Sequence, residues 1–315
     1  MKTDKKGIIV KSTGSWYEVR VTDGSHIRCR LRGVFRLDEK RDKDSNPVAV
    51  GDRVQITADQ TGEFVISSIE DRQNYIVRSS PKHKGARQVI AANLDQAVLV
   101  VTINQPRTSS GFIDRFLMTA AAYHIPVVLV FNKSDLCTGK HAVKLQQWVE
   151  EYKKIGYQVL QTAVPLQQGV DSFQRVLDNR CSLIAGHSGV GKSTLINAIA
   201  PNLNLRTGEL SVVHEKGMHT TTFAEMHFLP KGGSIIDTPG IKEFGITDFE
   251  PREMGHYFIE FRQWLPHCRF NNCTHDQEPG CAVRDAVERG EIWDERYKNY
   301  LNILSDYQEH FKHWE

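Results

Sequence analysis

The strongest chemical signal in the sequence is a glycine-rich segment that ends in lysine, serine and threonine. It matches the pattern G-x-x-x-x-G-K-[ST]. Backbone N–H groups of such a loop surround a nucleotide phosphate, and glycines keep side chains out of the way. Lys192 is expected to bridge the β- and γ-phosphates and to act in catalysis, and Ser193 to ligate Mg²⁺. The predicted phosphate loop consists of Gly186, His187, Ser188, Gly189, Val190, Gly191, Lys192, Ser193 and Thr194.

A second magnesium anchor is predicted 45 residues after Lys192. Asp237 begins the sequence Asp-Thr-Pro-Gly and follows the apolar pair Ile235-Ile236. An aspartate in this position commonly holds Mg²⁺, often through water. The N–H of Gly240 is expected to meet the γ-phosphate.

A base-recognition motif lies upstream of the phosphate loop, at Asn132, Lys133, Ser134 and Asp135. The carboxylate of Asp135 is expected to accept hydrogen bonds from guanine N1–H and N2–H₂. Adenine offers no matching pair of donors, so Asp135 disfavours an ATPase. Asn132 is expected to brace the site and Lys133 to lie along the base. The short piece Thr162-Ala163 is expected to offer a backbone N–H to guanine O6.

The order of these motifs is circularly permuted. In most guanine-nucleotide hydrolases the phosphate loop comes first and the base motif last, whereas here residues 132–135 precede residues 186–194. Permutation moves the breaks in connectivity and can leave the sheet and site unchanged. The segment after Gly240 then runs directly into the C-terminal part, which tethers a nucleotide-sensing loop to it.

A threonine-rich segment, residues 217–223, resembles a switch loop. Thr221 is the first choice for the Mg²⁺ ligand of the triphosphate state, with Thr220 and Thr222 as alternatives. Ile241 stands where a water-orienting glutamine is common, so another group must position the attacking water. His219 is the candidate, and the alternative is that it only shapes the loop. Intrinsic hydrolysis is therefore expected to be slow and to be accelerated by a partner.

Four potential metal ligands lie within 14 positions near the C-terminus: Cys268, Cys273, His275 and Cys281. Three thiolates and one imidazole are typical of a tetrahedral structural Zn²⁺ site. His267 is a rival ligand, but it lies beside Cys268. The metal is expected to hold together a segment with little apolar core.

The elements that position these motifs fall into three parts. Short alternating stretches between residues 7 and 75 predict five strands in a small barrel of the OB type. Apolar strands alternating with helical patterns follow and predict an α/β phosphate-loop domain. A final helix carries an apolar stripe that indicates packing. We expect residues 1–78 to form the barrel, 79–248 the permuted GTPase domain, with a linker at 79–85, and 249–315 a helical zinc-binding domain.

The N-terminal part carries an excess of positive charge, because residues 1–90 hold 18 Lys and Arg against 12 Asp and Glu. This excess indicates either a polyanion contact or a solvated basic surface. One group of side chains could form a face that stacks bases and contacts phosphates, or could equally be core aromatics and surface charge: Trp16, Tyr17, Arg28, Arg30 and Arg32. Residues 36–47 are expected to form a mobile charged loop.

Taken together, these features resemble the ribosome small subunit-dependent GTPase A family, RsgA, over essentially the whole chain. The resemblance maps the family's Gly-x-His-Thr-Thr loop onto residues 217–221 and its zinc ligands onto the four Cys and His residues above. It implies a GTP hydrolase that binds the small ribosomal subunit late in its maturation, contacts its rRNA and is stimulated by it. The alternative is a GTP-dependent RNA-binding regulator outside the ribosome.

The expected cofactors are one structural zinc ion and Mg²⁺ bound with GTP. No apolar run approaches the ~18 residues of a membrane span. The N-terminal residues lack the apolar core of a signal peptide. We therefore expect a cytoplasmic monomer that binds GTP and GDP and no membrane.

Overall fold

The five predicted N-terminal strands close into a barrel. The structure is a computed structural model, and it describes residues 4–13, 16–31, 47–59, 61–79, 87–205, 224–237 and 250–312. The strands follow the order β1-β2-β3-β5-β4, and β4 pairs back with β1. Only β3 and β5 are parallel among these pairs. They are β1 (Lys5–Ser12), β2 (Tyr17–Val21), β3 (His26–Leu31), β4 (Arg53–Ala58) and β5 (Phe64–Ile69).

Side chains that alternate along these strands fill the barrel. In β2, Tyr17, Val19 and Val21 are buried, while the residues between them are partly exposed. Tyr17 is only 4% exposed and packs in the core, so it does not belong to a base-stacking face. The period-2 pattern that predicted the strand therefore also decides which of its aromatics can meet a ligand.

A two-stranded antiparallel sheet, absent from the sequence prediction, follows the barrel. It consists of β6 (Tyr75–Ser79) and β7 (Arg87–Ala92). The strands flank the predicted linker, of which residues 80–85 lie outside the described residues. Arg72, in the segment that leads into this sheet, forms a buried ion pair with Asp52 of the barrel, with 2.7 Å between Nε and Oδ1.

The central sheet is built around five parallel strands, as the apolar runs predicted. Their order is β10 (Gln158–Thr162), β9 (Val127–Asn132), β8 (Gln96–Val101), β11 (Cys181–Ala185) and β13 (Ser234–Asp237). The antiparallel strand β12 (Glu225–Phe228) pairs with β13, and Lys11 of β1 is in register with Glu225 of β12. This pairing continues the sheet into the barrel, giving 11 strands in all.

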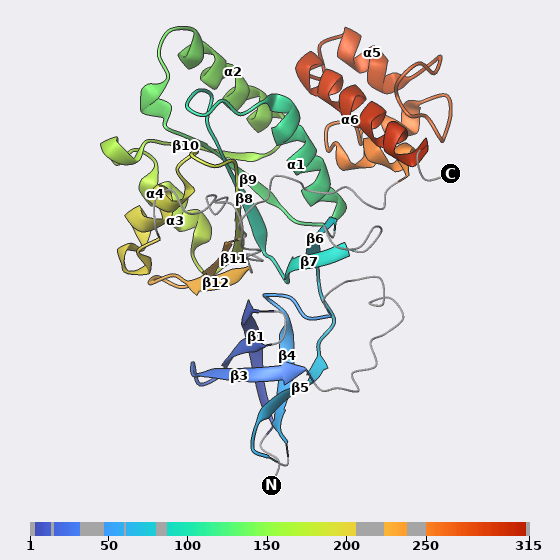
Figure 1. Cartoon of the computed structure of the whole chain (residues 1–315). Helices are drawn as coiled ribbons and strands as arrows, with labels where there is room; N and C mark the ends of the chain where they lie inside the picture. The colour runs from blue at the N-terminus through green and yellow to red at the C-terminus, as the bar shows by residue number, and fades with distance from the viewer. Residues whose placement is uncertain are drawn as a thin grey trace, which may run out of the picture.

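Helices cover both faces of the central sheet (Figure 1). Leu99 of β8 packs in one cluster with α1 (Ser110–Ala122) and α2 (Lys140–Ile155), whereas Val98 and Val100 pack with α3 (Val170–Leu177) and α4 (Lys192–Ile199). The helical stripe predicted in α2 is buried except at Val143, which is 71% exposed. Gly156 ends α2 in a left-handed conformation, as predicted.

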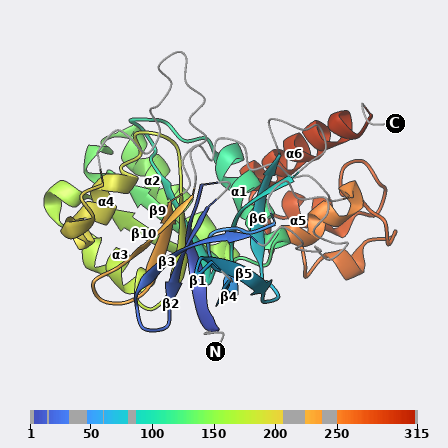
Figure 2. The same cartoon turned by 60° about the horizontal axis from the view of Figure 1, so that its bottom comes forward.

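The C-terminal part stands beside α1, on the side of the molecule away from α3 and α4 (Figures 1 and 2). It contains two short 3₁₀ helices, Pro251–Tyr257 and Leu265–His267, followed by α5 (Ala282–Glu288) and α6 (Asp294–Lys312). The C-terminal part was expected to have little apolar core, and this expectation was wrong. The buried apolar cluster of this part includes Met254, Phe258, Phe261, Val283, Ile292, Tyr300, Ile303, Leu304 and Tyr307. No helix among the described residues is long and apolar enough to cross a membrane.

Candidate nucleotide site and metal centre

The predicted phosphate loop connects β11 to α4. A Cβ on Gly186 would lie 2.1 Å from the carbonyl oxygen of Val100, and one on Gly191 would lie 2.4 Å from Asn132 Nδ2. Both glycines also have a left-handed backbone conformation. A side chain is therefore excluded both by the close contact and by the positive φ angle. Lys192 is buried, and its Nζ donates to the carbonyl oxygens of Gly186 at 2.7 Å and His187 at 2.8 Å. Its ammonium group is thus held against the loop that is expected to bind phosphate.

The base motif is joined to this loop by the side chain of Asn132. Its Nδ2 donates to Val190 O at 2.8 Å, and its Oδ1 accepts from Thr162 Oγ1 at 2.9 Å. Both Asn132 and Thr162 are buried. Ser134 Oγ donates to Thr162 O at 3.2 Å. The three predicted nucleotide-binding segments therefore meet at the carboxyl edge of the parallel sheet, where ligands bind in open α/β folds.

Lys133 makes a further connection that the sequence did not indicate. Its Nζ donates to Gly189 O at 2.7 Å and to Gln105 O at 2.8 Å, in the loop before α1. In the second base loop, the N–H of Ala163 donates to Gln168 O at 3.0 Å. Of the two residues predicted to offer an N–H to guanine O6, Ala163 therefore uses its N–H within its own loop.

Asp135 projects from the short 3₁₀ helix Ser134–Leu136 that follows β9. Its Oδ1 is buried and has no hydrogen-bond partner within the described part of the chain. An ionised carboxylate is an acceptor only, and leaving its oxygen buried and unpaired is costly. The geometry is that of an acceptor whose donors come from a ligand.

The magnesium and switch residues are only partly described. The backbone of Asp237 is in register with Ile184, two residues before the phosphate loop begins. His219, Thr220, Thr221, Thr222, Gly240 and Ile241 lie outside the described residues, as does most of the predicted loop at 36–47.

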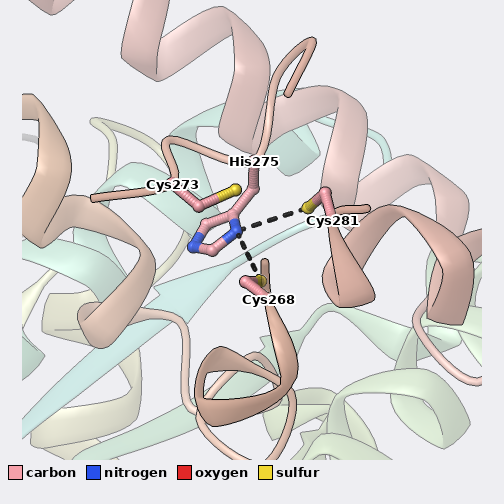
Figure 3. Close-up of side chains that lie close together, drawn as sticks. All are labelled: Cys268, Cys273, His275 and Cys281. Atoms are coloured by element: carbon pink, nitrogen blue, oxygen red, sulfur yellow. Dashed lines mark hydrogen bonds between the residues drawn. The ribbon is translucent and has the colours of Figure 1, made fainter. Parts of the chain in front are cut away.

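The four Cys and His residues come together as predicted (Figure 3). Their ligand atoms lie within 4.8 Å of one another. His275 Nδ1 is 3.6 Å from Cys268 Sγ and 3.5 Å from Cys281 Sγ. Donors about 2.0–2.3 Å from one metal ion at tetrahedral angles are separated by about 3.6 Å, so the cluster fits a metal ion.

Burial sets the protonation of these ligands. It lowers the pKa of His275 to about 4, which keeps the imidazole neutral and its lone pair free at neutral pH. Burial also raises the pKa of Cys273 to about 12 and raises that of Cys281. The thiols of Cys273 and Cys281 therefore hold their protons until a cation displaces them.

A buried ionic network, which no sequence pattern predicted, lies beside this part of the chain. Arg296 of α6 donates from Nη1 to Asp114 Oδ1 of α1 at 2.6 Å, and both side chains are fully buried. Each lies in an otherwise apolar helical pattern, where a charge would ordinarily mark the edge of the buried stripe.

Fold and site together define a guanine-nucleotide-binding protein with a permuted phosphate-loop domain. The RsgA GTPase family model matches residues 69–247, and the RsgA N-terminal domain model matches residues 6–66. The chain belongs to the RsgA GTPase family.

Relatives match the chain over nearly its whole length. The small ribosomal subunit biogenesis GTPase RsgA of Bacteroides fragilis is 51% identical over 304 residues, covering 96% of this chain and 97% of the relative. The same-named protein of Flavobacterium psychrophilum is 46% identical, covering 97% and 94%. The crystal structure of YjeQ from Thermotoga maritima superposes with a TM-score of 0.79 at 36% identity, covering 96% and 98%. YloQ, a circularly permuted GTPase, gives 0.73 at 30%, covering 98% and 96%. The permuted order is thus confirmed, and the chain is a GTPase.

Proposed function

We propose that this GTPase acts as a late assembly factor of the small ribosomal subunit, contacts its rRNA and is stimulated by it. The main support for this proposal is 51% sequence identity to a relative named for small-subunit biogenesis, over 97% of that relative's length. The proposed role places the protein in the cytoplasm as a monomer. We further propose domain boundaries at residues 1–78, 79–248 and 249–315.

The proposed chemistry begins with the described loop contacts. Lys192 exchanges its two carbonyl acceptors for the β- and γ-phosphates and stabilises the charge that develops in the transition state. Mg²⁺, held by Ser193, Asp237 and, in the triphosphate state, Thr221, would neutralise phosphate charge. His219 would orient the attacking water. Intrinsic hydrolysis would be slow, and the subunit would accelerate it by acting on the switch residues 217–222.

GTP turnover with and without purified small subunits tests this proposal. Added small subunits should raise the turnover number, and the protein should cosediment with them in a GTP analogue more than in GDP. If turnover does not change and sedimentation is equal in both nucleotides, the proposed ribosomal role is wrong.

The proposed rRNA surface lies on the outer face of β2 and β3. The ring of Trp16 is partly exposed, and the guanidinium groups of Arg28 and Arg30 lie 4.2 Å and 3.9 Å from its centroid. Both arginines are exposed. Two exposed guanidinium groups packed against a ring suit phosphate contact, and guanidinium planes can themselves stack on bases.

Replacing both arginines should weaken subunit binding electrostatically. In the double variant Arg28→Gln/Arg30→Gln, the negative slope of log K against log[salt] should become less steep by about 1–2. The reason is that each lost phosphate contact removes close to one released counterion. Binding titrations at several salt concentrations measure this. The charge-matched variant Lys153→Gln/Arg175→Gln, on exposed positions of α2 and α3, should keep the wild-type slope. Equal slopes in all three proteins would contradict the assignment.

We propose that the metal centre holds one structural zinc ion. Three thiolates and an imidazole are the donors that zinc prefers, and four protein ligands leave no position for a substrate. Tyr297 OH donates to His275 O at 2.7 Å, and Tyr300 OH donates to Thr274 O at 2.6 Å, which fixes the ligand-bearing turn on α6.

Gly255 is expected to be needed for metal affinity. A Cβ there would lie 2.7 Å from His275 Nε2 and 2.8 Å from its Cδ2, so Gly255→Ala should displace the ring. Zinc affinity, measured by competition with a chromophoric chelator, should fall by about 10–100-fold. Gly111→Ala is the control, because its Cβ would meet nothing closer than 3.5 Å. Unchanged zinc affinity in Gly255→Ala would show that the ring has room to move.

A further inference from the structure

Helix α1 lies between the phosphate loop and the C-terminal part, and it touches both (Figures 1 and 2). In its first turn, the ring of Phe112 stacks on the imidazole of His187, with centroids 3.9 Å apart and planes inclined by 32°. His187 is the second residue of the phosphate loop. The loop before α1 is tied to the same place, because Lys133 Nζ bonds both Gln105 O and Gly189 O. A displacement of the phosphate loop would therefore act on the first turn of α1 through these contacts.

The opposite side of α1 is held by the buried ionic network. Asp114 Oδ1 accepts from Arg296 Nη1 at 2.6 Å and from Tyr152 OH at 2.7 Å. Asp114 Oδ2 accepts from Asn299 Nδ2 at 2.6 Å. Arg296 Nε in turn donates to Glu260 Oε1 at 2.6 Å. Because separating α1 from α6 would break this hydrogen-bonded charge network, the network opposes relative movement of the two helices.

Two contacts nearer the surface also join the two helices. Ser110 Oγ, in the first turn of α1, donates to Glu295 Oε1 at 2.5 Å. Arg115 pairs with Asp306, about three turns further along α6. Ser110 and Phe112 thus place the α6 contact and the phosphate-loop contact in the same turn of α1.

Helix α6 carries the connection on to the metal centre. Its Tyr297 and Tyr300 donate to the carbonyl oxygens of His275 and Thr274. The ring of Tyr300 also packs edge-on against Phe258, at 5.1 Å between centroids. Side-chain contacts therefore run without a break from the phosphate loop, through α1 and α6, to the metal-binding turn.

We propose that α1 couples nucleotide occupancy of the phosphate loop to the conformation of the metal-binding domain, with Phe112 as the positioning residue at the loop. Packed side chains and hydrogen bonds on rigid elements are the physical means of such coupling. This route is separate from the covalent tether after Gly240, because it uses side-chain contacts on a helix that precedes the phosphate loop. By reciprocity, a ligand on the metal-binding domain alters nucleotide affinity by the same factor.

Hydrogen exchange on the full-length, zinc-loaded protein tests the coupling without ribosomal subunits. In wild type, binding of a non-hydrolysable GTP analogue should slow amide exchange in α6 and in residues 273–281 by about fivefold or more. In Phe112→Leu this nucleotide-dependent slowing should be lost, although the variant still binds the analogue. Tyr123→Leu removes an aromatic ring from the other end of α1, where it packs on Tyr75, and should respond like wild type.

Ser110→Ala provides a second variant that creates no buried charge. It deletes the hydrogen bond to Glu295 and should reduce the nucleotide-dependent slowing while leaving the zinc content unchanged. The proposal is overturned if wild type shows no nucleotide-dependent change in α6, or if both Phe112→Leu and Ser110→Ala retain the full change. The test stands independently of the proposed ribosomal role, which rests on subunit-stimulated turnover.

Discussion

Asp135→Asn should convert this GTPase into one that prefers xanthine nucleotides. We expect the wild-type carboxylate to accept from guanine N1–H and N2–H₂, whereas an asparagine would place its own N–H₂ donor against that of guanine. Xanthine carries a carbonyl at this position and accepts from the amide. Because sites built around buried hydrogen bonds reject mismatched partners strongly, kcat/KM for GTP should fall on the order of 10⁴-fold, and XTP should recover most of the loss.

The unpaired Oδ1 of Asp135 adds a second readout that needs no turnover. Without nucleotide, a buried carboxylate oxygen lacking a partner destabilises the fold, so the neutral isostere should leave the Tm of the free protein equal or higher. GDP should then raise the Tm of wild type but not of the variant, since ligand stabilisation follows affinity. Asp171→Asn, on an exposed position of α3, is the charge-matched control. Retained GTP preference in Asp135→Asn would show that another group selects the base.

The sequence predicted that the nucleotide motifs would lie together, because each motif combines residue type with a position on an element. A glycine-rich loop after an apolar strand and an Asn-Lys-Ser-Asp segment at the end of another must meet at one sheet edge. The contacts that join them were not predictable. Asn132 bonds Val190 across 58 positions of sequence, and only the strand order brings the two together.

Strands were predicted where burial alternates or an apolar run is continuous, and they were missed where pairing alone decides. Tyr17, Val19 and Val21 give β2 a clear period of two. In β12, only Met226 is buried, and the strand exists because it pairs with β13 on one side and β1 on the other. β6 and β7 likewise depend on each other. Such nonlocal pairing leaves little trace in a single segment.

The sequence also did not predict which charged side chains would be buried. Arg296 lies one helical turn before Tyr300 and belongs to the same buried face of α6. In α1, Asp114 stands between apolar residues such as Ile113 and Phe116. A sequence shows each charge alone, and only the fold shows that the two neutralise one another.

Arg296→Met should destabilise the protein by about 3–5 kcal/mol, the usual cost of removing one partner from a buried ion pair. Methionine fills much of the volume but leaves the carboxylates of Asp114 and Glu260 buried together. Urea unfolding at pH 7.5, followed by tryptophan fluorescence, measures the loss. Arg115→Met removes an exposed pair from the same interface and should cost about 1 kcal/mol or less.

The loss in Arg296→Met should depend on pH in a defined direction. Burial raises the pKa of Asp114, and Arg296 opposes that rise, so the substitution raises the pKa further. The folded variant then binds a proton that the unfolded chain releases between the ordinary aspartate pKa of about 3.9 and the raised value. Stability in that window falls as pH rises, so the deficit relative to wild type should shrink as pH is lowered from 7.5 toward 5. A deficit that is constant with pH would mean that solvent or another cation neutralises Asp114 once Arg296 is gone.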